Sequence, residues 1–205
     1  MKKLLFLTAL LQFLITPSSA QRRLVSHCDG SVMSMGGVHA YGSKNSSSKA
    51  GYLSISFKEG IEFSIVGGTL KSDEKEVSYF SPEIEMYSAS GRLHPFVDFA
   101  FLKWKRAKFA MPQSINFSGG MSVDITEGND FRLAPELGYG VVMILSGERS
   151  AKPQTGVFLG ISSAKQLTSK ASLVFSVSAN QLKNLWSGSI SIGLLFSADT
   201  PIITP

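Results

Sequence analysis

Five carboxylates and one arginine recur at alternate positions of otherwise apolar segments. A β-strand would place them on the face opposite to the apolar side chains. They are Glu83, Glu85, Asp98, Asp124, Arg132 and Glu136. If the strands bring them together, this interior charge cluster could gate a narrow cation-preferring pore, or it could only hold the strands in register. Because breaking a buried ion pair costs about 3–5 kcal/mol, we expect Arg132→Ala to destabilise the protein.

The histidines offer little for nucleophilic catalysis. A serine nucleophile needs a histidine base within hydrogen-bond reach, and the chain has only His27, His39 and His94. His94 has Ser88 and Ser90 nearby, but it falls at a turn expected on the inner side of a membrane, far from outer-leaflet lipids. We therefore predict that the protein is not an enzyme; an outer-membrane lipid-modifying enzyme is the less favoured alternative.

No metal or cofactor site is expected. The single cysteine, Cys28, and the scattered histidines lack the spacing of metal ligands. The pairs Gly67-Gly68 and Gly119-Gly120 lie inside strand-like segments, where glycine serves close approach or a bulge rather than phosphate binding. A single cysteine also excludes an internal disulfide, so stability must come from strand pairing.

Residues 114–146 show most clearly the elements that would position the charged side chains. On one parity lie Ile115, Phe117, Met121, Val123 and Ile125, and after a polar turn Phe131, Leu133, Leu137, Tyr139, Val141 and Met143. The other parity carries Asp124, Arg132 and Glu136 among small residues. This alternation predicts a long hairpin with one apolar and one polar face.

Ten short alternating segments can be placed along the chain, without helical periodicity between them. They are residues 31–41, 50–58, 61–70, 76–88, 93–105, 114–125, 130–146, 155–163, 170–178 and 187–197. Regular short strands separated by turn signals predict an all-β fold. We predict an antiparallel up-and-down transmembrane β-barrel of about ten strands, with eight as the alternative if two segments are loop or plug.

The apolar side chains at alternate positions of these segments could face either lipid or the core of a soluble protein. Strands of about ten residues suffice to cross a bilayer when tilted, and charged residues on the polar parity suit the interior of a membrane barrel better than a dry core. We therefore expect the serines, glycines and acids to fill the interior. The alternative is a secreted soluble β-barrel that binds an apolar ligand among inward apolar side chains.

The N-terminus has the pattern of a signal peptide. Lys2 and Lys3 precede an apolar run of about a dozen residues, and Ala20 ends a small-residue site at which cleavage is expected. The predicted organisation is a signal peptide over 1–20, a periplasmic segment over 21–30, the barrel over 31–197 and a tail over 198–205. The formal charge of +5 comes with no clustered basic and aromatic residues, so nucleic acid is not an expected partner.

Basic residues gather where the outer ends of the strands are expected. The outer connections would be residues 42–49, 71–75, 106–113, 147–154 and 179–186, mostly longer than the inner turns. A basic outer rim is predicted at Lys103, Lys105, Arg106, Lys108, Arg149, Lys152 and Lys183, and an aromatic belt at Trp104 and Trp186. These cations could bind lipopolysaccharide phosphates, or they could be ordinary solvated loop lysines.

Several short motifs resemble one known family. They are Phe80-Ser81-Pro82-Glu83, Leu93-His94-Pro95-Phe96-Val97, the stretch from Phe117 to Asp124, and Pro135-Glu136-Leu137-Gly138-Tyr139. Their order resembles the small outer-membrane β-barrel domain of the opacity and outer-membrane protein A type, over about residues 76–146 and the last strand. That family usually has eight strands and ends on an aromatic residue, whereas here Phe196 is followed by nine more residues.

The resemblance implies a bacterial outer-membrane protein with a structural, envelope-integrity or adhesive role. It would be inserted by the barrel-assembly machinery, would contact outer-membrane lipid or lipopolysaccharide, and would act as a monomer without a cofactor. The interior cluster adds the alternative of a narrow pore.

Overall fold

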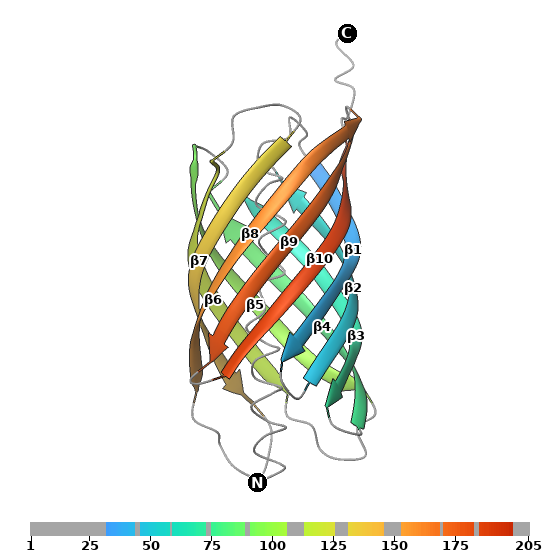
Figure 1. Ribbon diagram of the computed structural model, residues 1–205, viewed down its shortest axis with the longest axis vertical. Coiled ribbons are helices and arrows are strands. Elements are labelled where there is room, and N and C mark those ends of the chain that lie inside the picture. Colours follow the sequence, from blue (N-terminus) through green and yellow to red (C-terminus); the bar gives the residue numbers. More distant parts are fainter. Residues whose placement is uncertain are drawn as a thin grey trace.

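The computed structural model is an all-β structure of ten strands (Figure 1). It describes residues 32–43, 46–57, 59–72, 75–88, 91–105, 113–125, 131–145, 153–168, 170–182 and 185–198. The strands are β1 (Val32–Ser43), β2 (Ser46–Phe57), β3 (Ile61–Ser72), β4 (Lys75–Tyr87), β5 (Leu93–Lys105), β6 (Ser114–Val123), β7 (Phe131–Ile144), β8 (Gln154–Thr168), β9 (Ala171–Leu182) and β10 (Leu185–Ala198). Each predicted segment overlaps one of these strands.

The strands close into a single barrel. Each strand pairs antiparallel with its neighbours in sequence, and β1 pairs with β10 from Val32↔Ala198 to Ser43↔Ser187. Figure 1 shows the strands inclined to the barrel axis, which is the geometry that closure requires. The predicted ten-strand antiparallel barrel is confirmed, and the eight-strand alternative is wrong. Within the described ranges, no helix has the length and hydropathy needed to cross a membrane.

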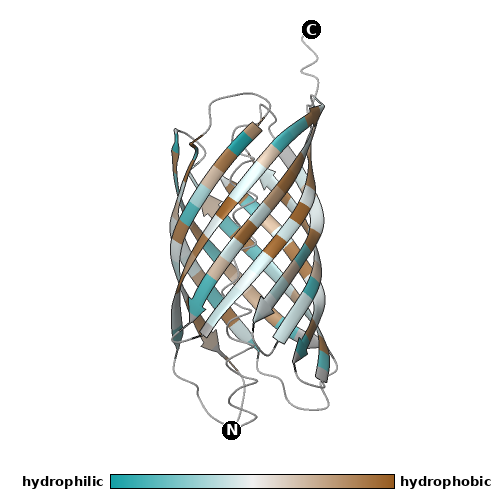
Figure 2. Ribbon diagram, viewed as in Figure 1, coloured by the Kyte–Doolittle hydropathy of each residue, from teal (hydrophilic) through white to brown (hydrophobic). Residues whose placement is uncertain are grey.

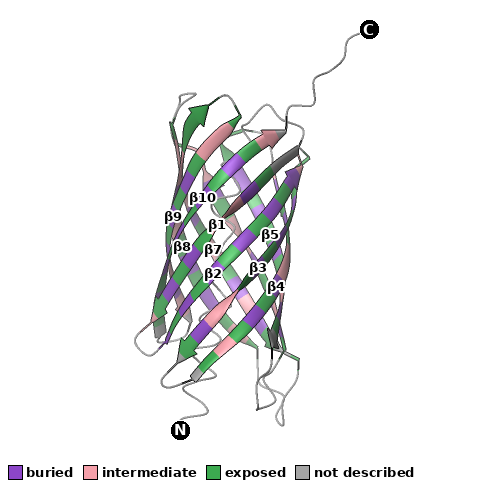
Figure 3. Ribbon diagram, turned by 90° about the vertical axis from the view of Figure 1, so that its right-hand side faces the viewer, coloured by how far each residue is buried: buried purple, intermediate pink, exposed green. Residues whose placement is uncertain are grey.

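Side chains alternate between the inside and the outside of the barrel with the period of a strand. On β2, Leu53 is 71% exposed, whereas Ser54 is 4% exposed. Figure 3 shows buried and exposed positions alternating along neighbouring strands, and Figure 2 shows the matching alternation of hydropathy. Apolar side chains therefore cover the exterior, and polar ones line the interior space, the lumen.

The predicted outward residues lie outside. Phe99, Leu137 and Ile192 are all exposed, by 44%, 59% and 45%. The soluble-barrel alternative needed these residues to converge on a common centre, so the structure contradicts it. The physical reason is the two-residue period of a strand: a strand that turns its charged residues inward must turn the intervening apolar residues outward.

Three of the expected outer connections are shorter than the sequence suggested. Two residues separate β1 from β2, β3 from β4, and β9 from β10, so the expectation of mostly longer outer connections is wrong. The strands continue through polar residues that had been assigned to loops. For example, Ser46 and Ser48 face inward, while Ser47 and Lys49 face outward.

The lumen holds more aromatic side chains than the expected serine, glycine and acid filling. Buried inward aromatic residues include Tyr41, Tyr52, Tyr79, Tyr87, Phe96 and Phe158. In one register row, Phe96 pairs with Gly120, Gly120 with Gly138, and Gly138 with Phe158. The two rings lie 5.9 Å apart between centroids. Glycines on β6 and β7 thus leave the space that these rings occupy.

Candidate functional site: the polar lumen and its rim

Three carboxylates form a row across neighbouring strands. Glu62 on β3 is the register partner of Glu85 on β4, which is the register partner of Asp98 on β5. Side chains that lie directly opposite on adjacent strands have Cβ atoms about 4.5–5.5 Å apart. Glu62 and Glu85 are fully buried and Asp98 nearly so. The row, Glu62–Glu85–Asp98, thus brings three acidic side chains together in the lumen.

Serines on adjacent strands support these acids. The Ser56 hydroxyl donates a hydrogen bond to Glu62 Oε2, and the Ser118 hydroxyl donates to Asp98 Oδ2 at 3.4 Å. Glu83, two residues from Glu85 on the same face of β4, accepts a hydrogen bond of 3.2 Å from Ser64. Buried charge is tolerated only when it is paired or hydrogen-bonded, so these hydroxyls help to keep the carboxylates in the lumen.

Two members of the predicted cluster meet at the end of the barrel where β6 is followed by β7. Arg132 Nη1 lies 3.8 Å from Asp124 Oδ2, and their side chains are 22% and 10% exposed. Arg132 is the second residue of β7, and Asp124 follows the end of β6. This separation is an ion-pair distance rather than a hydrogen bond. The pair therefore lies at one end of the barrel, away from the middle of the strands.

Glu136 is the buried acid of β7. Its register partner on β8 is Gly160, where an added Cβ would lie 2.6 Å from Glu136 Oε1. The glycine thus makes room for the carboxylate. The structure separates the six predicted residues into three groups. Glu83, Glu85 and Asp98 lie on β4 and β5, Arg132 and Asp124 form an ion pair at one end of the barrel, and Glu136 lies on β7.

Glu62 completes the acidic row but was missing from the predicted cluster. Glu62 and Ser64 are two residues apart on the polar face of their segment, so the inward position of Glu62 could be predicted from the sequence. Its neighbours could not be predicted, because only the register between strands sets Glu62 opposite both Ser56 and Glu85.

The wall formed by β9 and β10 is neutral and rich in hydroxyl groups. Ser176 and Ser191 are 3.1 Å apart, and Ser178 and Ser189 are 2.6 Å apart, measured between hydroxyl oxygens. The carboxylates of the acidic row lie on β3 to β5, and β9 and β10 contribute hydroxyl groups without a charged side chain.

His94 does not face a serine hydroxyl in its closest described contact. Its ring nitrogen Nδ1 lies 2.8 Å from the backbone carbonyl oxygen of Ser88. Ser90, His27 and Cys28 lie outside the described residues. Among the residues that the structure describes, no group of three or more His, Cys, Asp and Glu side chains is placed to hold a metal ion.

The predicted rim and belt are described only in part. Lys103 is exposed on β5, and Trp186 is 57% exposed on β10. Trp104 is the register partner of the inward Tyr79, and its side chain and that of Lys105 are outside the description. Outside the described residues lie Arg106, Lys108, Arg149, Lys152 and Lys183.

The barrel can be compared with known proteins through its fold. No protein-family model and no curated protein sequence matches the chain. The solved translocator domain of the autotransporter NalP from Neisseria meningitidis is similar, with a TM-score of 0.51, 10% identity, and coverage of 86% of this chain and 92% of that one.

Two further solved structures align over most of their length. The β-domain of the Bordetella autotransporter BrkA has a TM-score of 0.48 and 10% identity, covering 82% of this chain and 99% of that one. Neisserial surface protein A has a TM-score of 0.43 and 14% identity, covering 81% and 95%. The chain has the fold of the outer-membrane β-barrels.

Proposed function

We propose that this protein is an integral barrel of the outer membrane of a Gram-negative bacterium, with a structural, envelope-integrity or adhesive role. One observation carries the proposal. Large exposed apolar side chains occur on all ten strands, while carboxylates and serines are buried in the lumen. Soluble monomers rarely expose apolar patches larger than a few hundred Å², whereas a bilayer requires such a surface.

The strand lengths support a membrane position. The strands contain between 10 and 15 residues, and about 9–11 residues suffice for a tilted strand to cross the hydrocarbon. Closure of β1 onto β10 leaves no unpaired sheet edge in lipid, where an unpaired backbone group costs several kcal/mol. The proposal includes insertion by the barrel-assembly machinery and a monomeric state.

A structural role is consistent with the contact of His94. Its Nδ1 lies 2.8 Å from the backbone carbonyl oxygen of Ser88, a contact that ties the start of β5 to the end of β4. The lumen contributes cohesion through its serine–carboxylate hydrogen bonds.

A membrane-fraction gel tests the proposal. We expect the mature protein to sediment with outer membranes, and to migrate differently in unboiled and boiled detergent samples because the closed barrel resists unfolding. Recovery of a folded chain in buffer without detergent would contradict the membrane assignment.

The acidic row Glu62–Glu85–Asp98 favours a second candidate function, a narrow cation-preferring pore. In planar bilayers under a salt gradient, this function predicts a cation-selective reversal potential that shifts toward zero in Glu85→Gln. If heat-modifiable protein gives no conductance steps, the pore function is excluded and only the structural role remains.

A further inference from the structure

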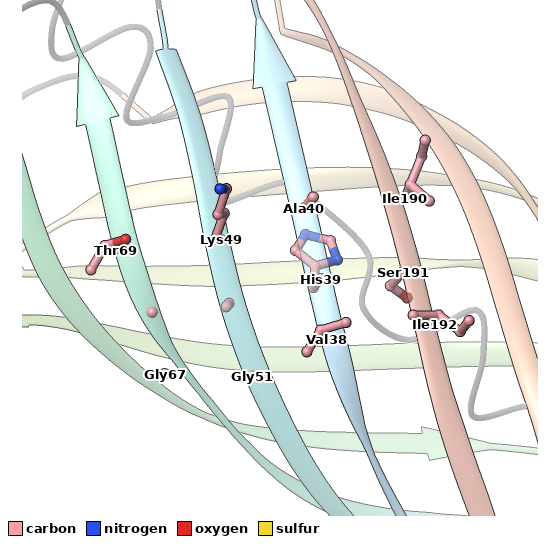
Figure 4. A pocket seen from close by; sticks show the side chains of 12 residues that line it. Val38, His39, Ala40, Lys49, Gly51, Gly67, Thr69, Ile190, Ser191 and Ile192 are labelled. Carbon is pink, nitrogen blue, oxygen red and sulfur yellow. The ribbon is translucent and has the colours of Figure 1, made fainter.

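The lipid-facing surface has a hollow where large apolar side chains are missing. On the outer faces of β1, β2 and β3, the residues Ala40, Gly51 and Gly67 are exposed and small. They line a pocket of about 520 Å³ together with the larger apolar Val38, Ile190 and Ile192 (Figure 4). The buried residues His39, Ala50 and Ser191 of the row between them also line it. This volume falls within the range of about 300–1,000 Å³ that is common for small-molecule sites.

A cation lies at this hollow. Lys49 is exposed and lines the pocket beside Thr69 (Figure 4). Its register partners are the neutral Ala40 and Thr69, whereas the outward Lys71 on β3 has Glu76 as its register partner. No other described residue forms an ion pair with Lys49. The hollow thus combines an apolar wall with an ammonium group that lacks a protein counter-charge in the described chain.

The position of Lys49 fits the boundary between hydrocarbon and headgroups. Lys49 lies three residues after the start of β2 at Ser46, which is about 10 Å along a strand. Val38 and Ile192 are register partners of each other toward the middle of the barrel. A ligand in the hollow would therefore meet positive charge near the rim and apolar side chains nearer the centre.

We propose that this hollow, the Lys49 groove, binds one anionic membrane lipid, with the lipid phosphate at the Lys49 ammonium and an acyl chain against Ala40, Gly51 and Gly67. The inference rests on the proposed membrane location, because only a barrel in a bilayer presents this face to lipid. Charge complementarity selects an anionic lipid over a zwitterionic one. A second copy of the chain would bring another lysine toward Lys49, which like-charge repulsion opposes.

Native mass spectrometry of the detergent-purified full chain, titrated with phosphatidylglycerol or phosphatidylcholine, tests the inference. We expect one phosphatidylglycerol to be retained in preference to phosphatidylcholine. Lys49→Met should weaken that binding about five- to tenfold, since one basic residue near an anionic surface contributes on this scale. Lys165→Met, which removes an exposed lysine of β8 outside both the groove and the basic outer rim, is the matched control and should bind like the wild type.

A variant that fills the groove provides a second test of lipid binding. An added Cβ at Gly51 has its nearest atom at 3.8 Å, so Gly51→Leu should fold and yet displace the acyl chain. Thr155→Leu, at an exposed position of β8, is the control for added apolar bulk. Equal lipid retention by Lys49→Met, Gly51→Leu and the two controls would overturn the inference, as would equal retention of both lipids.

The remaining outcomes are also decisive. A dimer that disappears in Gly51→Leu would show that a second copy occupies the groove, and would overturn the lipid assignment. Heat-modifiable migration of each variant shows that its barrel is folded. If the wild type shows no difference in migration between unboiled and boiled samples, the proposed membrane-barrel function itself is contradicted.

Discussion

At the scale of residues, ring-on-glycine contacts determine how the lumen is filled. A Cβ added at Gly138 would lie 2.2 Å from Phe158 Cζ, and one added at Gly193 would lie 2.2 Å from the Tyr52 hydroxyl oxygen. Real Cβ atoms do not approach other atoms this closely. The aromatic side chains therefore occupy the space that a Cβ at these two glycines would need.

Replacement of Gly138 by alanine should destabilise the barrel. The new methyl group must displace the Phe158 ring or the backbone, and overpacking of this kind costs about 1–3 kcal/mol. The urea midpoint of the detergent-folded protein should fall, and Phe158→Leu in the same chain should restore part of the loss. Gly188→Ala is the control, because its nearest neighbour would be 3.7 Å away. Equal midpoints for the two alanine variants would contradict the packing described for Phe158.

Replacement of Arg132 by alanine should cost less than a fully buried pair would imply. The Arg132–Asp124 pair is 3.8 Å long and partly exposed, and exposed pairs contribute about 0.2–1 kcal/mol. We expect a loss of about 1 kcal/mol, measured as a shift in urea midpoint, with a similar loss in Asp124→Asn. A loss of 3 kcal/mol or more would show that the pair is more deeply coupled to the lumen.

The sequence predicts which residues face inward but not which of them meet. Alternation places Glu85, Asp98 and Glu136 on the polar face without knowledge of the fold. Their neighbours depend on the register between strands, which sets Glu85 opposite Asp98 and Glu136 opposite Gly160. A sequence can therefore predict correctly that the charged residues face inward and still miss a residue that belongs to their group, as Glu62 shows.

At the scale of elements, period-two alternation is a sufficient signal for the strands. It identifies all ten, including β6 and β7, whose apolar and polar positions alternate around the turn between them. Strand ends are harder to predict, because serine and glycine are also loop residues. The hydrogen bond of 2.8 Å between the hydroxyl groups of Ser43 and Ser46 occurs where β1 and β2 pair to their ends.

A charge placed on the outer face should be costly in the middle of a strand. Phe99 is the seventh residue of β5, and its side chain is 44% exposed. Arginine at the bilayer midplane costs about 2–4 kcal/mol, and near the interface about 0–1 kcal/mol. We expect Phe99→Arg to reduce the folding free energy in lipid vesicles by the larger amount. Thr155→Arg, at the second residue of β8, should show the smaller loss. Equal losses at the two sites would exclude a depth-dependent environment.

At the scale of the whole molecule, closure of the barrel and the outward placement of its apolar side chains act together. Pairing of β1 with β10 satisfies the backbone of both terminal strands, and the alternation around all ten strands gives a continuous apolar exterior. The sequence predicts that the apolar side chains face outward from three features together: the charged residues at the alternate positions, the strand lengths and the signal-peptide pattern. Shape within the exterior, including the Lys49 groove, is not predicted, because it depends on which small residues become neighbours across β1, β2 and β3.

The most direct test of the account is an accessibility scan along β5. In a Cys28→Ser background, single cysteines at positions 97 to 101 would carry nitroxide labels in vesicle-reconstituted protein. Collisions with oxygen, which concentrates in lipid, should be frequent at 97, 99 and 101 and rare at 98 and 100. Frequent collisions of labels at 97, 99 and 101 with a water-soluble nickel complex, with oxygen excluded, would contradict a lipid-facing exterior.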